Sequence, residues 1–113
     1  MTFMLKHLKD ILPRLTSHGV GEKRVLLSAG ETETAVTQIA VTTLHAGETA
    51  NGHSHATMEE YFFFLHGEAA LTIDGERTAC HEGDFVQIRK GTFHTLEAVS
   101  EVEVMTIGIA TEM

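Results

Sequence analysis

The feature that most restricts the fold is a succession of short β-prone runs after Gly21, with glycines and aspartates between them. The runs are rich in Val, Ile, Phe, Thr and Leu, and most of these residue types favour strands. The expected strands are 24–27, 35–44, 61–65, 69–73, 85–88 and 102–109. Asp74-Gly75 lies between two β-prone segments and predicts a two-residue hairpin turn. Many short strands with glycines at the corners predict an all-β antiparallel sandwich or barrel.

The beginning of the chain has a different pattern. Its leucines are spaced by three and four residues, as on one face of a helix, at Leu5, Leu8, Leu12 and Leu15. Pro13 interrupts any helix there, so a short helix that ends before Pro13 and an extended lead-in strand are both consistent with the sequence. The 113 residues have room for one domain. We therefore divide the chain into a lead-in segment, 1–22, and a β-barrel domain, 23–113.

Charge and composition exclude several function classes. The net charge is −8, from 8 basic and 16 acidic residues, and the basic residues are scattered, so nucleic acid and anionic membranes are not expected partners. No run of about 18 apolar residues predicts a membrane span, and the N-terminus lacks the pattern of a signal peptide. The single cysteine, Cys80, excludes an internal disulfide and has no basic neighbour to activate it, so it is expected to be inert. These features predict a cytoplasmic protein.

The aromatic strand that begins at Glu60 is apolar on both faces. Phe62 and Phe64 share a face with Glu60, whereas Tyr61, Phe63 and Leu65 lie on the opposite face. A strand of an isolated small barrel should have one polar face, so we expect the outer face to be covered by the N-terminal segment or by a second subunit. The sequence therefore predicts a homodimer.

Histidines and acids gather just before this strand. His53 and His55 are two residues apart, so they point to the same side of an extended strand, and Glu60 follows five residues later. Two imidazoles and a carboxylate suit a divalent ion such as iron(II), manganese, nickel or zinc. His94, which follows strand 85–88 and a turn, is the best candidate for a third imidazole. A His-x-His pair alone is common, and by itself it does not distinguish a metal site from surface histidines.

Taken together, two stretches of the sequence resemble the two motifs of the cupin family. The first contains, in order, Gly47, five residues, His53-x-His55, four residues, Glu60, six residues and Gly67. The second contains Gly83, five residues, Arg89-x-Gly91, two residues and His94. The two motifs are separated by the short segment 68–82. Arg89 stands where the family usually has Pro, and Ala98 where a final Asn is common; both departures concern loop geometry rather than the metal site.

The resemblance implies a double-stranded β-helix, a jelly-roll-like cupin barrel, that holds one divalent transition metal in its interior. The implied ligands are His53, His55, Glu60 and His94. Glu59 competes with Glu60, because the family accepts three or four residues before its Glu. Glu60 is preferred because six residues separate it from Gly67 and because it is in phase with the buried aromatic side chains. Three imidazoles and one carboxylate leave two open positions on an octahedral ion.

Cupins include oxygenases, isomerases, decarboxylases, sugar-binding modules and storage proteins, so the fold does not name a reaction. The first hypothesis is a metalloenzyme of dioxygenase or isomerase type that acts on a small organic molecule. The alternative is a non-catalytic module that binds or senses a small molecule. The open metal positions favour the enzyme, whereas the lack of an obvious acid–base residue besides the ligands favours the module.

Further residues are assigned places in this barrel. Gln38 and Arg89 are candidate polar contacts for a substrate. His66 shares the phase of Glu60 but is expected at the barrel rim, because it ends the strand. Four phenylalanines are expected mainly in the core, with one or two beside the metal: Phe62, Phe64, Phe85 and Phe93.

Overall fold

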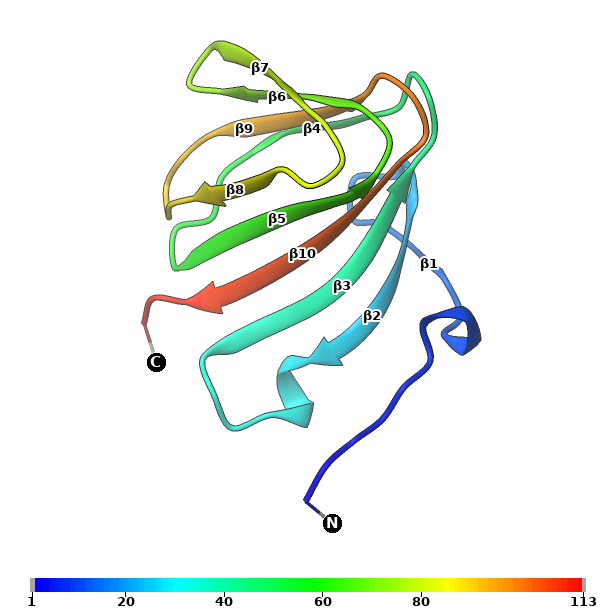
Figure 1. Ribbon diagram of the computed structural model, residues 1–113. Helices are drawn as coiled ribbons and strands as arrows, with labels where there is room; N and C mark the ends of the chain where they lie inside the picture. Colours follow the sequence, from blue (N-terminus) through cyan, green and yellow to red (C-terminus); the bar gives the residue numbers. More distant parts are fainter. Residues whose placement is uncertain (1, 113) are drawn as a thin grey trace.

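The computed structural model describes residues 2–112, and its strands form two antiparallel sheets that face each other (Figure 1). The larger sheet contains, in spatial order, β1 (Arg14–Leu15), β2 (Glu22–Ser28), β3 (Val36–Leu44), β10 (Val102–Ala110), β5 (Met58–His66) and β8 (Phe85–Ile88). The smaller sheet contains β4 (Thr49–His53), β9 (His94–Ala98), β6 (Ala69–Ile73) and β7 (Glu76–Cys80). The predicted all-β class is confirmed, and the two sheets form a jelly-roll-like barrel.

Local sequence explains the hairpin between β6 and β7. Asp74 and Gly75 both adopt positive φ angles, 50° and 83°, which is the conformation of the two central residues of a type I′ turn. Ile73 and Glu76 are therefore directly opposite each other, and the register continues to Ala69 and Cys80. The predicted two-residue turn is confirmed.

All six expected strands are present, and the structure adds four more between residues 2 and 112, among them β7 of the predicted hairpin. The most important are β4 and β9, which pair with each other and complete the smaller sheet. β4 contains Asn51-Gly52, and both residue types are unfavourable in strands. Its extended conformation depends on pairing with β9, a contact between segments that are far apart in the sequence.

The lead-in segment contains a three-residue 3₁₀ helix, η1 (Leu8–Asp10), and then β1. Both conformations considered for this segment thus occur in short form, on either side of Pro13. The leucines do not form a buried helical face, because Leu5, Leu12 and Leu15 are 74%, 83% and 72% exposed. In the described part of the chain, no helix has the length and apolar character needed to cross a membrane.

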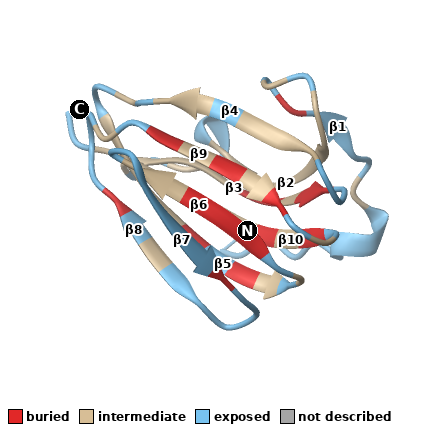
Figure 2. Cartoon of the chain, turned by 90° about the horizontal axis from the view of Figure 1, so that it is seen from above, coloured by how far each residue is buried: buried red, intermediate tan, exposed pale blue. Residues whose placement is uncertain are grey.

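The core lies between the two sheets, where the fully buried side chains include Phe64, Leu44, Leu71, Val102 and Val104. Figure 2 shows buried positions concentrated on strands such as β6, β9 and β10, with exposed residues toward the ends and in the loops. Phe62 belongs to the same core, so the prediction for Phe62 and Phe64 is confirmed.

The core prediction was wrong for Phe85 and Phe93, which are 62% and 55% exposed. Phe85 lies on the edge strand β8 opposite Phe63, and therefore shares the outward face of the sheet. Phe93 lies in the turn before β9, and its ring packs over Gly52, where a Cβ atom would approach the ring to 2.0 Å. Phe63 itself is 40% exposed, so the lead-in segment does not shield the outer face of β5.

Candidate metal centre

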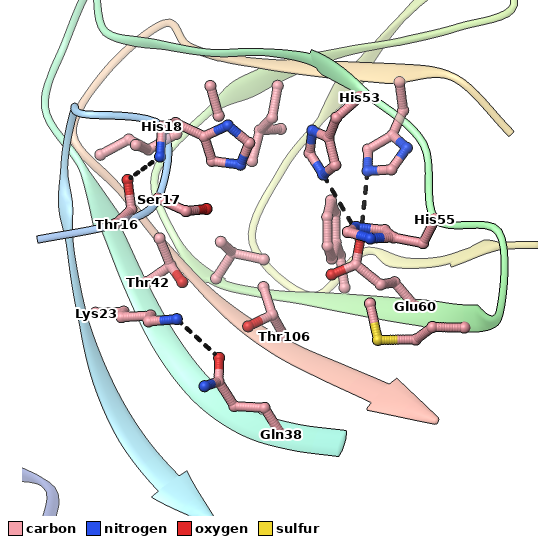
Figure 3. A pocket seen from close by; sticks show the side chains of 17 residues that line it. Thr16, Ser17, His18, Lys23, Gln38, Thr42, His53, His55, Glu60 and Thr106 are labelled. Carbon is pink, nitrogen blue, oxygen red and sulfur yellow. Dashed lines mark hydrogen bonds and ion pairs between the residues drawn. The ribbon is translucent and has the colours of Figure 1, made fainter. Parts of the chain in front are cut away.

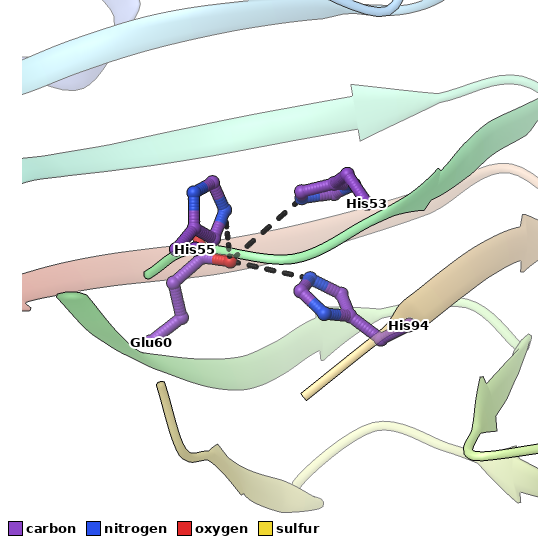
Figure 4. A group of neighbouring side chains, drawn as sticks. All are labelled: His53, His55, Glu60 and His94. Carbon is purple, nitrogen blue, oxygen red and sulfur yellow. Dashed lines mark ion pairs between the residues drawn. The ribbon is translucent and has the colours of Figure 1, made fainter. Parts of the chain in front are cut away.

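The four predicted ligands come from both sheets. His53 is the last residue of β4 and His94 the first of β9, and the two are directly opposite each other in the ladder. His55 follows two residues after β4, and Glu60 lies on β5 in the larger sheet. Figure 4 shows the three imidazoles arranged around the Glu60 carboxylate. The fold therefore gathers these side chains between the sheets.

One ligand atom from each of the four residues lies within 4.8 Å of all the others. Glu60 Oε1 is 3.1 Å from His55 Nε2, 3.3 Å from His94 Nε2 and 4.0 Å from His53 Nε2. Despite the short distances, Glu60 Oε1, His55 Nε2 and His94 Nε2 are buried and form no geometrically acceptable hydrogen bond. Buried polar atoms without partners are costly, and a cation among them would satisfy all of them. The residues present therefore fit the metal that the family resemblance implies.

Backbone carbonyls hold two of the imidazoles in a suitable tautomer. His53 Nδ1 is 3.1 Å from the Asn51 carbonyl oxygen, and His94 Nδ1 is 2.9 Å from that of Thr92. A carbonyl oxygen only accepts hydrogen bonds, so each Nδ1 carries a hydrogen. In the neutral ring, Nε2 then presents its lone pair to the cluster, as metal coordination requires.

Burial and the neighbouring charged groups together determine the pKa values of the clustered side chains. Burial raises the pKa of Glu60, but the neighbouring imidazoles of His94, His55 and His53 outweigh it, and the pKa lies below its ordinary value. Burial lowers the pKa of His94, but the Glu60 carboxylate and the Thr92 carbonyl raise it above the ordinary value. Burial is also the main reason that the pKa of His53 is lowered. Glu60 is thus an ionised carboxylate that attracts a positive charge, whether a proton or a metal ion.

Glu59 lies on the outer face of β5 and is not part of the cluster. Its carboxylate accepts hydrogen bonds from the Tyr61 hydroxyl and from Gln87 Nε2, the latter at 2.9 Å. The structure thus places Glu60, rather than Glu59, beside the histidines. His66 is exposed at the end of β5, outside the cluster.

The cluster forms one end of a cavity of about 210 Å³, which Figure 3 shows with its lining side chains. This is smaller than the range of about 300–1,000 Å³ that is typical for drug-sized ligands. Apolar walls come from residues such as Phe62, Leu96 and Val104. Gln38 lines the cavity, as expected for a candidate polar contact, whereas Arg89 is exposed and does not line it. The space suits a small organic molecule.

The cavity residues that the sequence interpretation missed include two with ionisable side chains, His18 and Lys23. His18 lies in the turn before β2, and its ring centroid is 4.5 Å from that of His53. Lys23 lies on β2 and donates a hydrogen bond from Nζ to Gln38 Oε1 at 3.1 Å. No motif surrounds either residue, so only the pairing of β2 with β3 reveals their positions. Cys80 is buried, and burial raises the pKa of its thiol, in agreement with its expected inertness.

Comparison with known proteins identifies similar sequences and folds. The family model described as the cupin domain matches residues 40–109. An uncharacterised protein of Methanocaldococcus jannaschii is 34% identical over 50 residues, which are 44% of this chain and 40% of that relative. The match thus spans about two-fifths of the relative's length.

Solved structures show the same fold over nearly the whole chain. A predicted oxalate decarboxylase of Thermotoga maritima has a TM-score of 0.88 at 23% identity, covering 95% of this chain and 99% of its own. An ectoine synthase of P. lautus has a TM-score of 0.83 at 19% identity, covering 95% of this chain and 78% of its own. At these identities the similarity shows the fold alone.

Proposed function

The chain belongs to the cupin family, and from this we propose that it binds one divalent transition metal through His53, His55, Glu60 and His94 and acts there on a small organic molecule. The observation that carries the proposal is the convergence of four donor atoms within 4.8 Å, three of them buried without a hydrogen-bond partner. A set of imidazoles and one carboxylate suits iron(II), manganese, nickel or zinc. When bound, such an ion supplies Lewis acidity and open coordination positions for a substrate.

The surrounding residues would hold a substrate beside the metal centre. Phe62, Leu96 and Val104 provide an apolar wall that excludes water, and Phe62 packs edge-on near His94, with ring centroids 6.1 Å apart. His18 provides a hydrogen-bonding ring on the side of the cavity next to His53. We propose a metalloenzyme of dioxygenase or isomerase type, because the cavity offers both a metal centre and polar groups that can orient a small molecule.

One observation favours the second candidate, a non-catalytic module that captures or senses a small molecule. Among the described residues that line the cavity, Glu60 is the single carboxylate, and the metal cluster already uses it. Among these residues no carboxylate is left to act as a general acid or base, so such a role would fall to His18 or Lys23.

Metal analysis of protein purified without added metal tests the proposal. We expect about one ion per chain in the natural protein and an empty site in His53→Ala and His94→Ala, because each variant loses an imidazole donor. His66→Ala is the matched control, since His66 is exposed and outside the cluster. One ion per chain in both ligand variants would contradict the site. Oxygen uptake by an iron-containing protein would support the dioxygenase, whereas a catalytically inert zinc protein would support the module.

A further inference from the structure

We propose that Lys23 forms a carboxylate-binding subsite in the cavity, so that the ligand of this protein is a small organic acid that reaches both Lys23 and the metal centre. The inference deepens the proposed function and rests on it, since it places one end of the ligand at the metal. Figure 3 shows Lys23 and Gln38 on the side of the cavity away from Glu60, His53 and His55.

The first observation is a positive charge in the cavity without a counterion. Lys23 is partly buried and lines the cavity, and its Nζ donates to the neutral side chain of Gln38. Within residues 2–112, Lys23 forms no ion pair with any carboxylate. By contrast, Lys6, at the surface, pairs with Glu31 at 3.0 Å. Removing a cation from water without a partner is unfavourable, so an anionic ligand group would stabilise this arrangement.

The second observation is the set of hydrogen-bonding groups around this charge. Gln38 Oε1 accepts the hydrogen bond from Lys23, which leaves the amide nitrogen of Gln38 as a donor in the cavity wall. Thr42 is directly opposite Lys23 in the β2–β3 ladder and also lines the cavity, so its hydroxyl adds a second donor to the same cavity. An ammonium group with amide and hydroxyl donors matches the acceptor oxygens of a carboxylate.

The third observation is the separation of this group from the metal centre. Gln38 and Glu60 are both paired with Gly108 of β10, on opposite sides of that strand. Their backbones are thus two strand spacings apart, roughly 10 Å, and both side chains line the cavity. A ligand of a few carbon atoms is long enough to reach from one group to the other, in agreement with the cavity volume of about 210 Å³.

The charges define the ligand further. A divalent ion and the Glu60 carboxylate together leave one positive charge at the metal end, and Lys23 adds a second in the same cavity. With the ion bound, the cavity would be electropositive although the whole chain carries a net charge of −8, and it would favour anions locally. The ligand class that fits is a dicarboxylate, or a carboxylate whose hydroxyl or keto group binds the metal.

Calorimetric titration of protein loaded with one equivalent of Mn²⁺ tests the proposal. The probes are succinate and glutarate, with butyrate and valerate as monocarboxylates of the same chain lengths. In the natural protein we expect the better dicarboxylate to bind at least tenfold more tightly than the corresponding monocarboxylate. Lys23→Met should remove this preference, whereas Lys9→Met should keep it, because Lys9 is exposed on η1 outside the cavity. Unchanged dicarboxylate affinity in a metal-loaded Lys23→Met protein, or no preference in the natural protein, would overturn the proposal.

Two further measurements distinguish a failure of the proposed metal site from a failure of the proposed carboxylate subsite. If the natural protein holds no metal, the proposed function fails, and the subsite is tested on the metal-free protein with butyrate. Chemical-shift changes at the Gln38 and Thr42 amides that disappear in Lys23→Met would support the subsite, and their absence would overturn it. If Lys23→Met does not fold, the natural protein is titrated with succinate and with its monoamide, succinamate. Equal affinity for the two would overturn the role of a second carboxylate.

Discussion

The two faces of β5 carry chemically similar residues that differ in burial and in hydrogen bonding. On the inner face, Phe64 is fully buried and Glu60 lies in the metal cluster without a hydrogen-bond partner for Oε1. On the outer face, Phe63 is 40% exposed, and Glu59 is held by hydrogen bonds from Tyr61 and Gln87. The difference shows that the phase of a residue along the strand, rather than its chemical type, determines whether it belongs to the core, the site or the surface.

The phenylalanine pair gives the largest expected contrast. Phe64→Ala should lower the free energy of unfolding by about 3–5 kcal/mol, because it leaves a cavity between the two sheets. Phe63→Ala should lower it by less than about 1 kcal/mol in dilute protein, since its side chain is already partly in water. Urea denaturation measures both values. Equal losses would show that the two faces of β5 are not distinguished by packing.

The glutamate pair tests the same contrast at the metal centre. Glu60→Gln should weaken metal binding on the order of a hundredfold or more, because it removes a ligand charge from a buried cluster, whereas outer-shell changes typically cost about 10–100-fold. Glu59→Gln should change the affinity by less than about threefold. Competition titration with a metal-binding dye measures both variants. A full site in Glu60→Gln and an empty one in Glu59→Gln would reverse the assignment.

The outer face of β5 provides a third prediction, the homodimer expected from its apolar character. Tyr61 and Phe85 stack in parallel on this face, with centroids 6.0 Å apart, beside the exposed Phe63. Burying such a side chain contributes about 1.5–3 kcal/mol, so light scattering at micromolar concentration should give a dimer mass. Phe63→Lys should shift the mass toward the monomer. Val99→Lys, at an exposed loop position, is the control and should not; a monomeric natural protein would contradict the prediction.

The smallest expected effect is a gradual loss of metal affinity at the inner-face cluster as the pH falls. Imidazoles must be unprotonated to bind a metal, and the raised pKa of His94 extends proton competition above its ordinary range. The lowered pKa of Glu60 keeps this carboxylate ionised in the same interval. Metal affinity should therefore begin to fall above the ordinary histidine pKa of about 6.5 and continue to fall as the pH decreases below it, by up to about tenfold per pH unit for each proton taken up. Titrations at pH 5, 6 and 7 measure the slope, and constant affinity over this interval would contradict histidine ligation.

Sequence alternation and motif spacing were sufficient to predict the all-β class, the Asp74-Gly75 hairpin and the inward phase of Glu60. They did not predict the features that depend on pairing between strands far apart in the sequence. Nothing near Lys23 indicates a cavity residue until β2 pairs with β3. Phe85 resembles a core residue, and its exposure follows from the position of β8 at the sheet edge. β4 becomes a strand despite Asn51-Gly52 because β9 supplies its partner.

Because the donors come from two sheets, metal binding is linked to the packing of these sheets against each other. His53 and His94 become neighbours as soon as β4 pairs with β9, whereas Glu60 reaches them only when the larger sheet closes over the smaller one. With the sheets apart, an ion would have only imidazoles as ligands, and closure would add the Glu60 carboxylate. Because a ligand that prefers the closed state stabilises it by mass action, a bound ion would reduce the fraction of molecules in which the sheets are separated. Metal binding and closure of the two sheets would then be linked equilibria, each favouring the other.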